Sequence, residues 1–144
     1  MNDLYDLLRY LIVLRATGND KRLDAIECYF RGHSPKECSI RTGVERTALK
    51  AMIVRVCHMG RGYNLYRLVP LLVNVIKRTI PVVVEDYVGK QYCRLCGRMM
   101  RLDMGNWVQH FEWSHRRWLI EQIERIEYIV GGFERYRING YVYA

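Results

Sequence analysis

Two cysteines and two histidines in the second half of the chain have the residue types and the spacing of a metal site. They follow the pattern Cys93-x2-Cys96-x13-His110-x4-His115. Two thiolates on a tight turn and two imidazoles on a following helix can converge on one tetrahedral ion, and this donor set suits Zn²⁺. Because protein ligands fill all four positions, the sequence predicts one structural zinc ion and no open position for catalysis. The alternative is a coincidental spacing of thiols and helical histidines.

Residues 91–118, which contain these ligands, resemble a C2H2 zinc finger, a β-hairpin followed by a helix. In that family the residue three before the first histidine packs under the metal, and Trp107 stands there. The chain departs from the family pattern in a longer loop between the ligand pairs and in the core aromatic residue, which Met100 or Leu102 replaces. Histidines five positions apart lie about 140° apart around an ideal helix. We therefore expect the helix to tighten or bulge near Ser114.

The resemblance also implies positions on the finger that contact DNA. Counted back from the first histidine, the base-reading positions are Asp103, Asn106 and Gln109, and Asn and Gln are natural partners of adenine in the major groove. The arginines that could hold phosphates are Arg94, Arg98, Arg101, Arg116 and Arg117. Since one finger contacts only about three base pairs, a zinc staple or a protein-docking surface is the alternative role.

Residues 34–53 resemble a helix-turn-helix of the kind found in bacterial and archaeal regulators. Such a motif needs a small residue where the helices touch, a glycine at the turn and apolar residues under the second helix. The residues at these places are Cys38, Ser39, Gly43, Val44, Leu49 and Met52. In such a motif the second helix enters the major groove and the start of the first helix meets phosphate. The residues implied to contact DNA are Ser34, Lys36, Glu45, Arg46, Thr47, Lys50 and Arg55. An ordinary helical hairpin with a solvated charged face is the alternative.

The charge of the chain is concentrated in these two stretches. The 144 residues include 23 Lys and Arg against 15 Asp and Glu, a net charge of +8. Residues 31–67 carry +6 and residues 90–117 carry +4, so the rest of the chain sums to −2. A basic excess of this kind fits a polyanionic partner, although it also describes a basic protein with no role in nucleic-acid binding.

Periodicity and capping residues predict the elements that position these side chains. Helices are expected over residues 2–17, 20–30, 34–42, 45–58 and 64–78, with Ser34 and Glu37 forming a capping box and Pro70 entering or kinking the last of them. The first is expected to be an amphipathic helix that docks on the rest. A strand is predicted within residues 82–88, followed by a cysteine-bearing hairpin and a long helix over 104–130. Asn139-Gly140 predicts a C-terminal β-hairpin.

These elements predict a mainly α fold with a small ββα zinc finger. Residues 1–80 form the expected helical bundle with the helix-turn-helix at 34–58, and residues 81–144 the finger, at 91–118, with its extended helix and the terminal hairpin. The apolar stripe of the long helix consists of Trp107, Phe111, Trp118 or Leu119, Ile123, Ile126 and Val130. We expect it to pack against the N-terminal helix, and a dimer seam is the alternative. Cys28, Cys38 and Cys57 are expected to be small buried residues.

Several functional classes are disfavoured by what the sequence lacks. No segment reaches the roughly 18 consecutive apolar residues of a membrane span, and the acidic start has no leader pattern, so we expect an intracellular protein. A nucleophile–base motif and a Gly-rich phosphate loop are both missing, so we do not expect an enzyme. The expected location is the cytoplasm, with nucleoid association or in the host cell of a virus.

The two motifs together predict sequence-specific binding of double-stranded DNA by a transcription regulator. The combination of a bacterial-type reading helix with a lone C2H2 finger resembles the small regulators encoded by viruses and plasmids of thermophilic archaea. Expected partners are duplex DNA and the transcription machinery, with no membrane and with a homodimer as an option. The alternative is a zinc-stabilised protein-interaction module that binds a polymerase or another host factor, or an RNA-binding protein.

Overall fold

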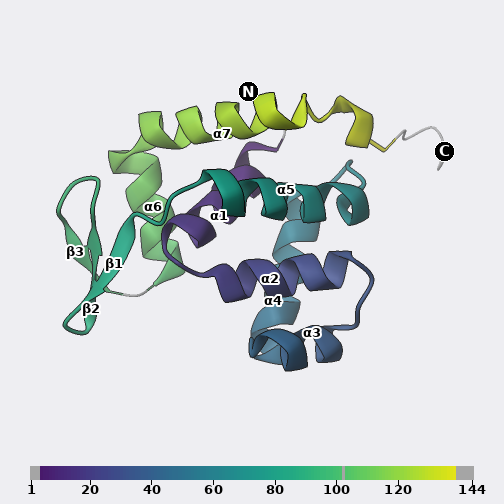
Figure 1. Ribbon diagram of the computed structural model, residues 1–144, viewed down its shortest axis with the longest axis horizontal. Helices are drawn as coiled ribbons and strands as arrows, with labels where there is room; N and C mark the ends of the chain where they lie inside the picture. Colours follow the sequence, from purple (N-terminus) through teal and green to yellow (C-terminus); the bar gives the residue numbers. More distant parts are fainter. Residues whose placement is uncertain (1–3, 102, 139–144) are drawn as a thin grey trace.

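The computed structural model describes residues 4–101 and 103–138, and in this part the chain is mainly helical with one small sheet (Figure 1). The helices are α1 (Tyr5–Ala16), α2 (Asp20–Phe30), α3 (Pro35–Thr42), α4 (Arg46–Met59), α5 (Leu65–Thr79), α6 (Met104–Ser114), α7 (Arg116–Val130) and the short 3-10 turn η1 (Glu134–Tyr136). The strands are β1 (Val84–Tyr87), β2 (Lys90–Cys93) and β3 (Met99–Met100), and they form an antiparallel sheet in the order β1-β2-β3. The predicted mainly α class with a small β unit is confirmed.

Helix α1 is the central helix of the molecule: it docks on the rest as predicted, but it is buried on nearly every side and not along one amphipathic face. It packs against α2, α4, α5, α6 and α7, and in Figure 1 it lies behind α5 in the middle of the fold. Its buried residues are Leu7, Leu8, Tyr10, Leu11, Ile12, Val13, Leu14 and Ala16. A helix that is apolar on nearly every side loses least free energy when other helices surround it.

Helix α3 begins where the capping residues predicted. Ser34 has an extended backbone and its Oγ accepts a hydrogen bond from the Glu37 N–H at 3.1 Å, with Pro35 in the first turn. The reciprocal half of the capping box does not form. The Glu37 carboxylate instead contacts Arg41 at 2.7 Å and the His33 ring at 3.2 Å, because an ion pair one helical turn away competes with the uncharged backbone N–H.

Three residues, Gly43, Val44 and Glu45, connect α3 to α4. Gly43 has φ +78°, a left-handed conformation that favours glycine at the end of a helix. The Ser39 hydroxyl donates to the Val44 carbonyl at 2.6 Å, which closes the turn. Helix α2 packs against both α3 and α4, so these two short helices rest on a common support.

Two of the three cysteines outside the predicted metal site are buried, as expected, and one is not. Cys28 is buried on α2 and Cys38 on α3. Cys57 lies on the exposed side of α4, so the prediction that Cys57 is buried was wrong. Burial, together with the neighbouring Cys28 thiol, raises the pKa of Cys38 to about 12. A thiol with so high a pKa has little thiolate at neutral pH and is chemically inert.

Helix α5 continues on both sides of Pro70, and the Pro70 side chain is buried. The following segment enters the sheet, where Val84 pairs with Cys93 and Tyr87 with Lys90. The turn between β1 and β2 has Val88 at φ +48° and Gly89 at φ +77°, the two positive values of a tight two-residue hairpin. Strands β2 and β3 then pair across the turn that carries Cys96, with Tyr92 opposite Met99.

The long helix predicted over 104–130 is two helices. Helix α6 ends at Ser114, His115 leaves helical geometry with φ −133° and ψ +34°, and α7 starts at Arg116. The interruption falls where we expected the helix to tighten. A complete break turns the His115 ring back toward His110, which a continuous helix would not allow.

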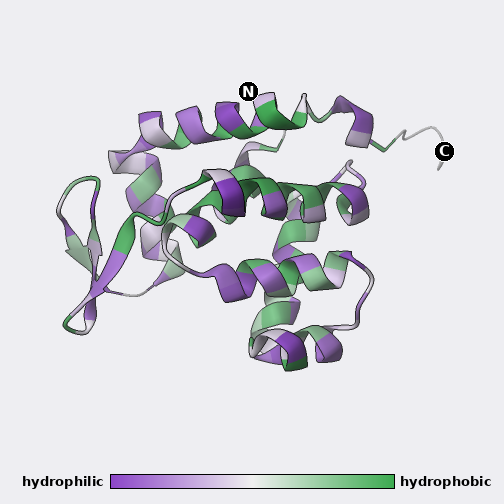
Figure 2. Cartoon of the chain, in the orientation of Figure 1, coloured by the Kyte–Doolittle hydropathy of each residue, from purple (hydrophilic) through white to green (hydrophobic). Residues whose placement is uncertain are grey.

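Helix α7 buries its apolar stripe inside the same chain, as predicted. It packs against α1 and α5, with Leu119, Ile123, Ile126 and Val130 buried. Figure 2 shows hydrophilic and hydrophobic residues alternating along this helix. The core therefore includes helices from both sides of residue 80, while the predicted division into two domains stays a prediction.

The chain beyond α7 returns to the connection between α4 and α5. The Asn64 N–H donates to the Tyr136 carbonyl at 2.6 Å, and the Ile138 N–H donates to the Gly62 carbonyl at 2.8 Å. The predicted hairpin at Asn139-Gly140 lies outside the described residues. Among the described helices, none has both the length and the apolar composition that crossing a membrane requires.

Candidate metal centre and nucleic-acid interface

Four elements bring the predicted metal ligands to one point. Cys93 ends β2, Cys96 lies in the turn before β3, His110 is on α6 and His115 is the residue between α6 and α7. Their Sγ and imidazole nitrogen atoms all lie within 4.8 Å of one another. Residues separated by up to 22 positions in the sequence thus form one Cys2His2 cluster that could bind one metal ion.

The distances within this Cys2His2 cluster fit tetrahedral coordination. The Nε2 atoms of His110 and His115 are 3.2 Å apart, Cys96 Sγ is 3.4 Å from His110 Nε2, and Cys93 Sγ is 3.6 Å from His115 Nε2. Metal–sulfur bonds of about 2.3 Å and metal–nitrogen bonds of about 2.0 Å imply tetrahedral edges of about 3.5 Å for sulfur–nitrogen and about 3.3 Å for nitrogen–nitrogen. The cluster therefore has the dimensions of a coordination shell.

The turn between the two cysteines is shaped to hold a thiolate. The Gly97 N–H donates to the Cys93 carbonyl at 2.7 Å, and Gly97 has φ +80°. Burial raises the pKa of the Cys93 thiol, and hydrogen bonds from the backbone N–H groups of Leu95 and Cys96 partly oppose this rise. Backbone donors aimed at a sulfur stabilise its deprotonated form, which is the form that binds metal.

The two histidines are held in the form that a metal requires. Burial lowers the pKa of both imidazoles, and for His110 the charges of His115 and Arg98 lower it further. An imidazole with a lowered pKa stays neutral over a wider pH range and keeps a lone pair for coordination. The Nε2 atoms of both rings face the cluster, and within the described residues His110 Nδ1 is buried without a hydrogen-bond partner.

Beneath the cluster lies an apolar layer that joins it to α1. Trp107 and Phe111 are fully buried and pack with Val13 and Ala16 of α1, so Trp107 occupies the place predicted for it. The Trp107 indole N–H donates to the Gln91 side-chain carbonyl at 2.7 Å. Met100 packs partly against this layer, and Leu102 lies outside the described residues.

Glu112 connects α6, which carries His110, to α1 and was not identified from the sequence. Its carboxylate accepts a hydrogen bond from the Tyr5 hydroxyl at 2.7 Å and from Arg9 at 3.1 Å, and it also pairs with Arg116. Burial alone would raise the pKa of Glu112, but the hydrogen bonds and the positive charges outweigh it and the pKa is lowered. A glutamate two residues after a histidine gives no sequence signal for this role, because two of its partners, Tyr5 and Arg9, lie more than 100 residues away.

Helix α4 presents one polar face to solvent. Arg46, Thr47 and Lys50 are exposed on this face together with Val54, whose side chain is 69% exposed. The opposite face consists of the buried residues Leu49, Met52, Ile53 and Val56. Glu45 is exposed just before the helix, and Ser34 and Lys36 are exposed at the start of α3. Six of the seven residues predicted there thus lie at the surface of the α3–α4 pair.

The seventh residue, Arg55, points to a different part of the molecule. Its position is nine residues after Arg46, which places it about 180° from Arg46 around the helix axis, at the other edge of the exposed surface of α4. Its guanidinium lies over the Tyr10 ring of α1, 5.5 Å from the centroid. Arg55 therefore belongs to the contact between α4 and α1, although its side chain is exposed.

The predicted DNA-contacting residues of the second stretch are also exposed. Arg98 and Arg101 lie next to β3, and Asn106 and Gln109 lie one turn apart on α6. Asp103 instead caps α6, since its carboxylate accepts a hydrogen bond from the Gly105 N–H at 2.9 Å. In Figure 1 the sheet lies at the left and α3 at the lower right, whereas α4 and α6 approach each other, since Arg55 and Met59 line one pocket with Met104 and Val108.

A comparison with protein-family models finds no match, and neither do comparisons with curated protein sequences and with solved structures.

Proposed function

We propose that the chain is a sequence-specific double-stranded DNA-binding protein that acts as a transcription regulator. The observation that carries this proposal is the exposed face of α4, where Arg46 and Lys50 form no ion pair with any acid in the described part of the chain. Positive side chains without local acid partners keep their full attraction for phosphate and base edges.

The α3–α4 pair supports this role as a helix-turn-helix. In the proposed complex α4 lies in the major groove, where Arg46 pairs with guanine and Glu45 accepts from cytosine or positions Arg46. The first turn of α3, with Ser34 and Lys36, meets phosphate through its backbone N–H groups and its charge. The packing of α2 on both helices supplies the rigid support that such docking requires.

We propose that the Cys2His2 cluster binds Zn²⁺ as a structural ion in a zinc finger. Two thiolates and two imidazoles at tetrahedral spacing suit zinc better than the divalent ions that prefer oxygen ligands. All four donors come from the protein, so the ion would hold the β2–β3 turn against α6. Asn106, Gln109, Arg98 and Arg101 then form a second, smaller contact with DNA.

One observation favours the alternative of a protein-interaction module. Trp113 on α6 is 78% exposed and Tyr128 on α7 is 87% exposed, and large exposed aromatic side chains are frequent anchors at protein interfaces. A host factor such as a polymerase would then be the partner. Trp113→Ala would abolish its capture while leaving duplex binding unchanged.

The test of the DNA proposal is a selection of bound sequences from random duplexes, followed by titration of the selected duplex. Replacing Arg46 and Lys50 with Ala should weaken binding at least tenfold and reduce the slope of log K against log salt by about two. The matched control replaces Lys21 and Arg78, two exposed bases on other helices, and should leave affinity within about twofold. Absence of duplex binding at low salt, or equal losses in both double variants, would contradict the proposal.

A further inference from the structure

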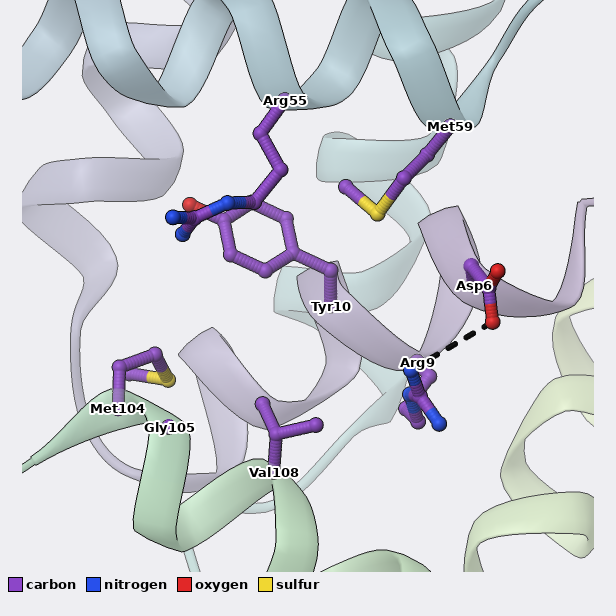
Figure 3. Close-up of a pocket in the computed structure, with 8 residues that line it drawn as sticks. All are labelled: Asp6, Arg9, Tyr10, Arg55, Met59, Met104, Gly105 and Val108. Carbon is purple, nitrogen blue, oxygen red and sulfur yellow. Dashed lines mark ion pairs between the residues drawn. The ribbon is translucent and has the colours of Figure 1, made fainter.

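A pocket of about 280 Å³ lies where α1, α4 and α6 meet (Figure 3). It is lined by Asp6, Arg9 and Tyr10 of α1, by Arg55 and Met59 of α4, and by Met104, Gly105 and Val108 of α6. The lining contains none of the four residues of the Cys2His2 cluster and none of Arg46, Thr47 and Lys50, and of the predicted DNA-contacting residues it includes Arg55. The pocket is thus distinct from both surfaces discussed above.

Three apolar side chains form one part of the pocket. Figure 3 shows Met59 extending from α4 and Val108 extending from α6 toward the same space, with Met104 at its edge. Methionine side chains are flexible and polarisable, so they adapt their shape to an apolar ligand. This side of the pocket favours a hydrocarbon or aromatic group.

The side chains of Arg9 and Arg55 form the other part of the pocket. Carboxylates pair with one of these arginines and not with the other. Arg9 is paired, with Asp6 at 3.5 Å and Glu112 at 3.1 Å. Arg55 lies over the Tyr10 ring and hydrogen-bonds the Tyr10 side chain, and no carboxylate pairs with it within the described residues. One guanidinium at the pocket is therefore available to a ligand anion, and a guanidinium binds a carboxylate through two parallel hydrogen bonds.

We propose that this pocket binds a small amphipathic carboxylate, an aromatic or short-chain acid. The carboxylate pairs with Arg55, and the apolar body packs against Met59, Met104 and Val108. The volume is just below the usual range of about 300–1,000 Å³ for pockets that hold drug-sized ligands, so the ligand has one ring system or a short chain. This binding does not rest on the proposed DNA function, because the pocket uses a different side of α4.

The test follows the methionine methyl signals of the metal-loaded full chain by NMR. Titration with 1-naphthoate should shift the signals of Met59 and Met104 saturably, while the signal of Met52, which is buried elsewhere on α4, stays unchanged. The uncharged probe 1-naphthamide should bind at least tenfold more weakly, because it lacks the charge that Arg55 recognises. Unshifted signals of Met59 and Met104, or equal affinities for acid and amide, would overturn the proposal.

Two variants separate the charge from the cavity. Arg55→Met should reduce the affinity for 1-naphthoate about tenfold and leave that for 1-naphthamide unchanged, whereas the exposed control Arg61→Met should alter neither. Val108→Phe should fill the space and abolish binding of both probes. Retained naphthoate affinity in a folded Val108→Phe variant would place the ligand outside this pocket and refute the assignment.

Discussion

The two cysteines of the Cys2His2 cluster lie in different surroundings. Cys93 is buried and receives backbone hydrogen bonds on its sulfur, whereas Cys96 is exposed. Without the metal ion, the buried sulfur of Cys93 has lost the positive charge that compensates it, whereas Cys96 is open to water. Replacement of Cys93 should therefore destabilise the cluster more than replacement of Cys96.

Purified protein should contain one zinc ion per chain, and Cys93→Ser should reduce the zinc content to near zero. The control is Cys57→Ser, which removes an exposed thiol outside the cluster and should keep the full zinc content. Elemental analysis of freshly purified protein measures both. Equal zinc contents in the two variants would disprove the assignment of the cluster.

Glu112 should make stability depend on pH in the acidic range. Its pKa is lowered from 4.5 in the folded chain, so its contribution is fully present above about pH 4.5 and is lost as pH falls through the lowered value. The difference in unfolding free energy between wild type and Glu112→Gln should therefore shrink on acidification. Urea denaturation of both proteins between pH 3 and 7 measures it, and a difference independent of pH would refute this role.

At the level of the elements, the turn between α3 and α4 depends on one glycine. Gly43 has φ +78°, and nothing lies within 4 Å of the position that a Cβ would take. The cost of a side chain there is therefore conformational and not steric. A substitution of Gly43 therefore measures the conformational cost of a side chain at φ +78°, without a packing contribution, just before the proposed reading helix α4.

Gly43→Ala should lower the free energy of unfolding by about 1 kcal/mol, and Gly43→Asn by less, because asparagine tolerates the left-handed region better than alanine. Denaturant unfolding at neutral pH measures both values. If the two variants are equally stable, strain at φ +78° is not what selects glycine at this position.

At the level of the whole molecule, α1 connects the Cys2His2 cluster to the helical core. Val13 and Ala16 pack with Trp107 and Phe111, while the rest of α1 packs with α2, α4, α5 and α7. The Val83 N–H also donates to the Ala16 carbonyl at 2.9 Å. Loss of a metal ion from the cluster should therefore lower the thermal stability of the whole fold.

Thermal unfolding of the metal-loaded chain should be one transition, with the same midpoint by far-UV circular dichroism and by tryptophan fluorescence. Removal of the metal with a chelator should lower both midpoints together, because the apolar layer under the cluster includes residues of the central helix. If chelation left the helical transition unchanged, the division at residue 80 would separate two independent domains.

The sequence by itself determined the features that depend on local chemistry. The clustering of Cys93, Cys96, His110 and His115, the cap at Ser34, the turn at Gly43 and the apolar face of α4 follow from residue types at short spacing, and each is found where it was predicted. These features recur whenever the backbone adopts the same local geometry, so neighbouring residues suffice to specify them.

Only the tertiary structure decided the features that depend on distant neighbours. The break at His115, the burial of α1 on nearly all sides, the direction of Arg55 and the partners of Glu112 were missed or only partly anticipated. Each results from packing between segments far apart in the chain, where burial and pairing energies outweigh local helix preference.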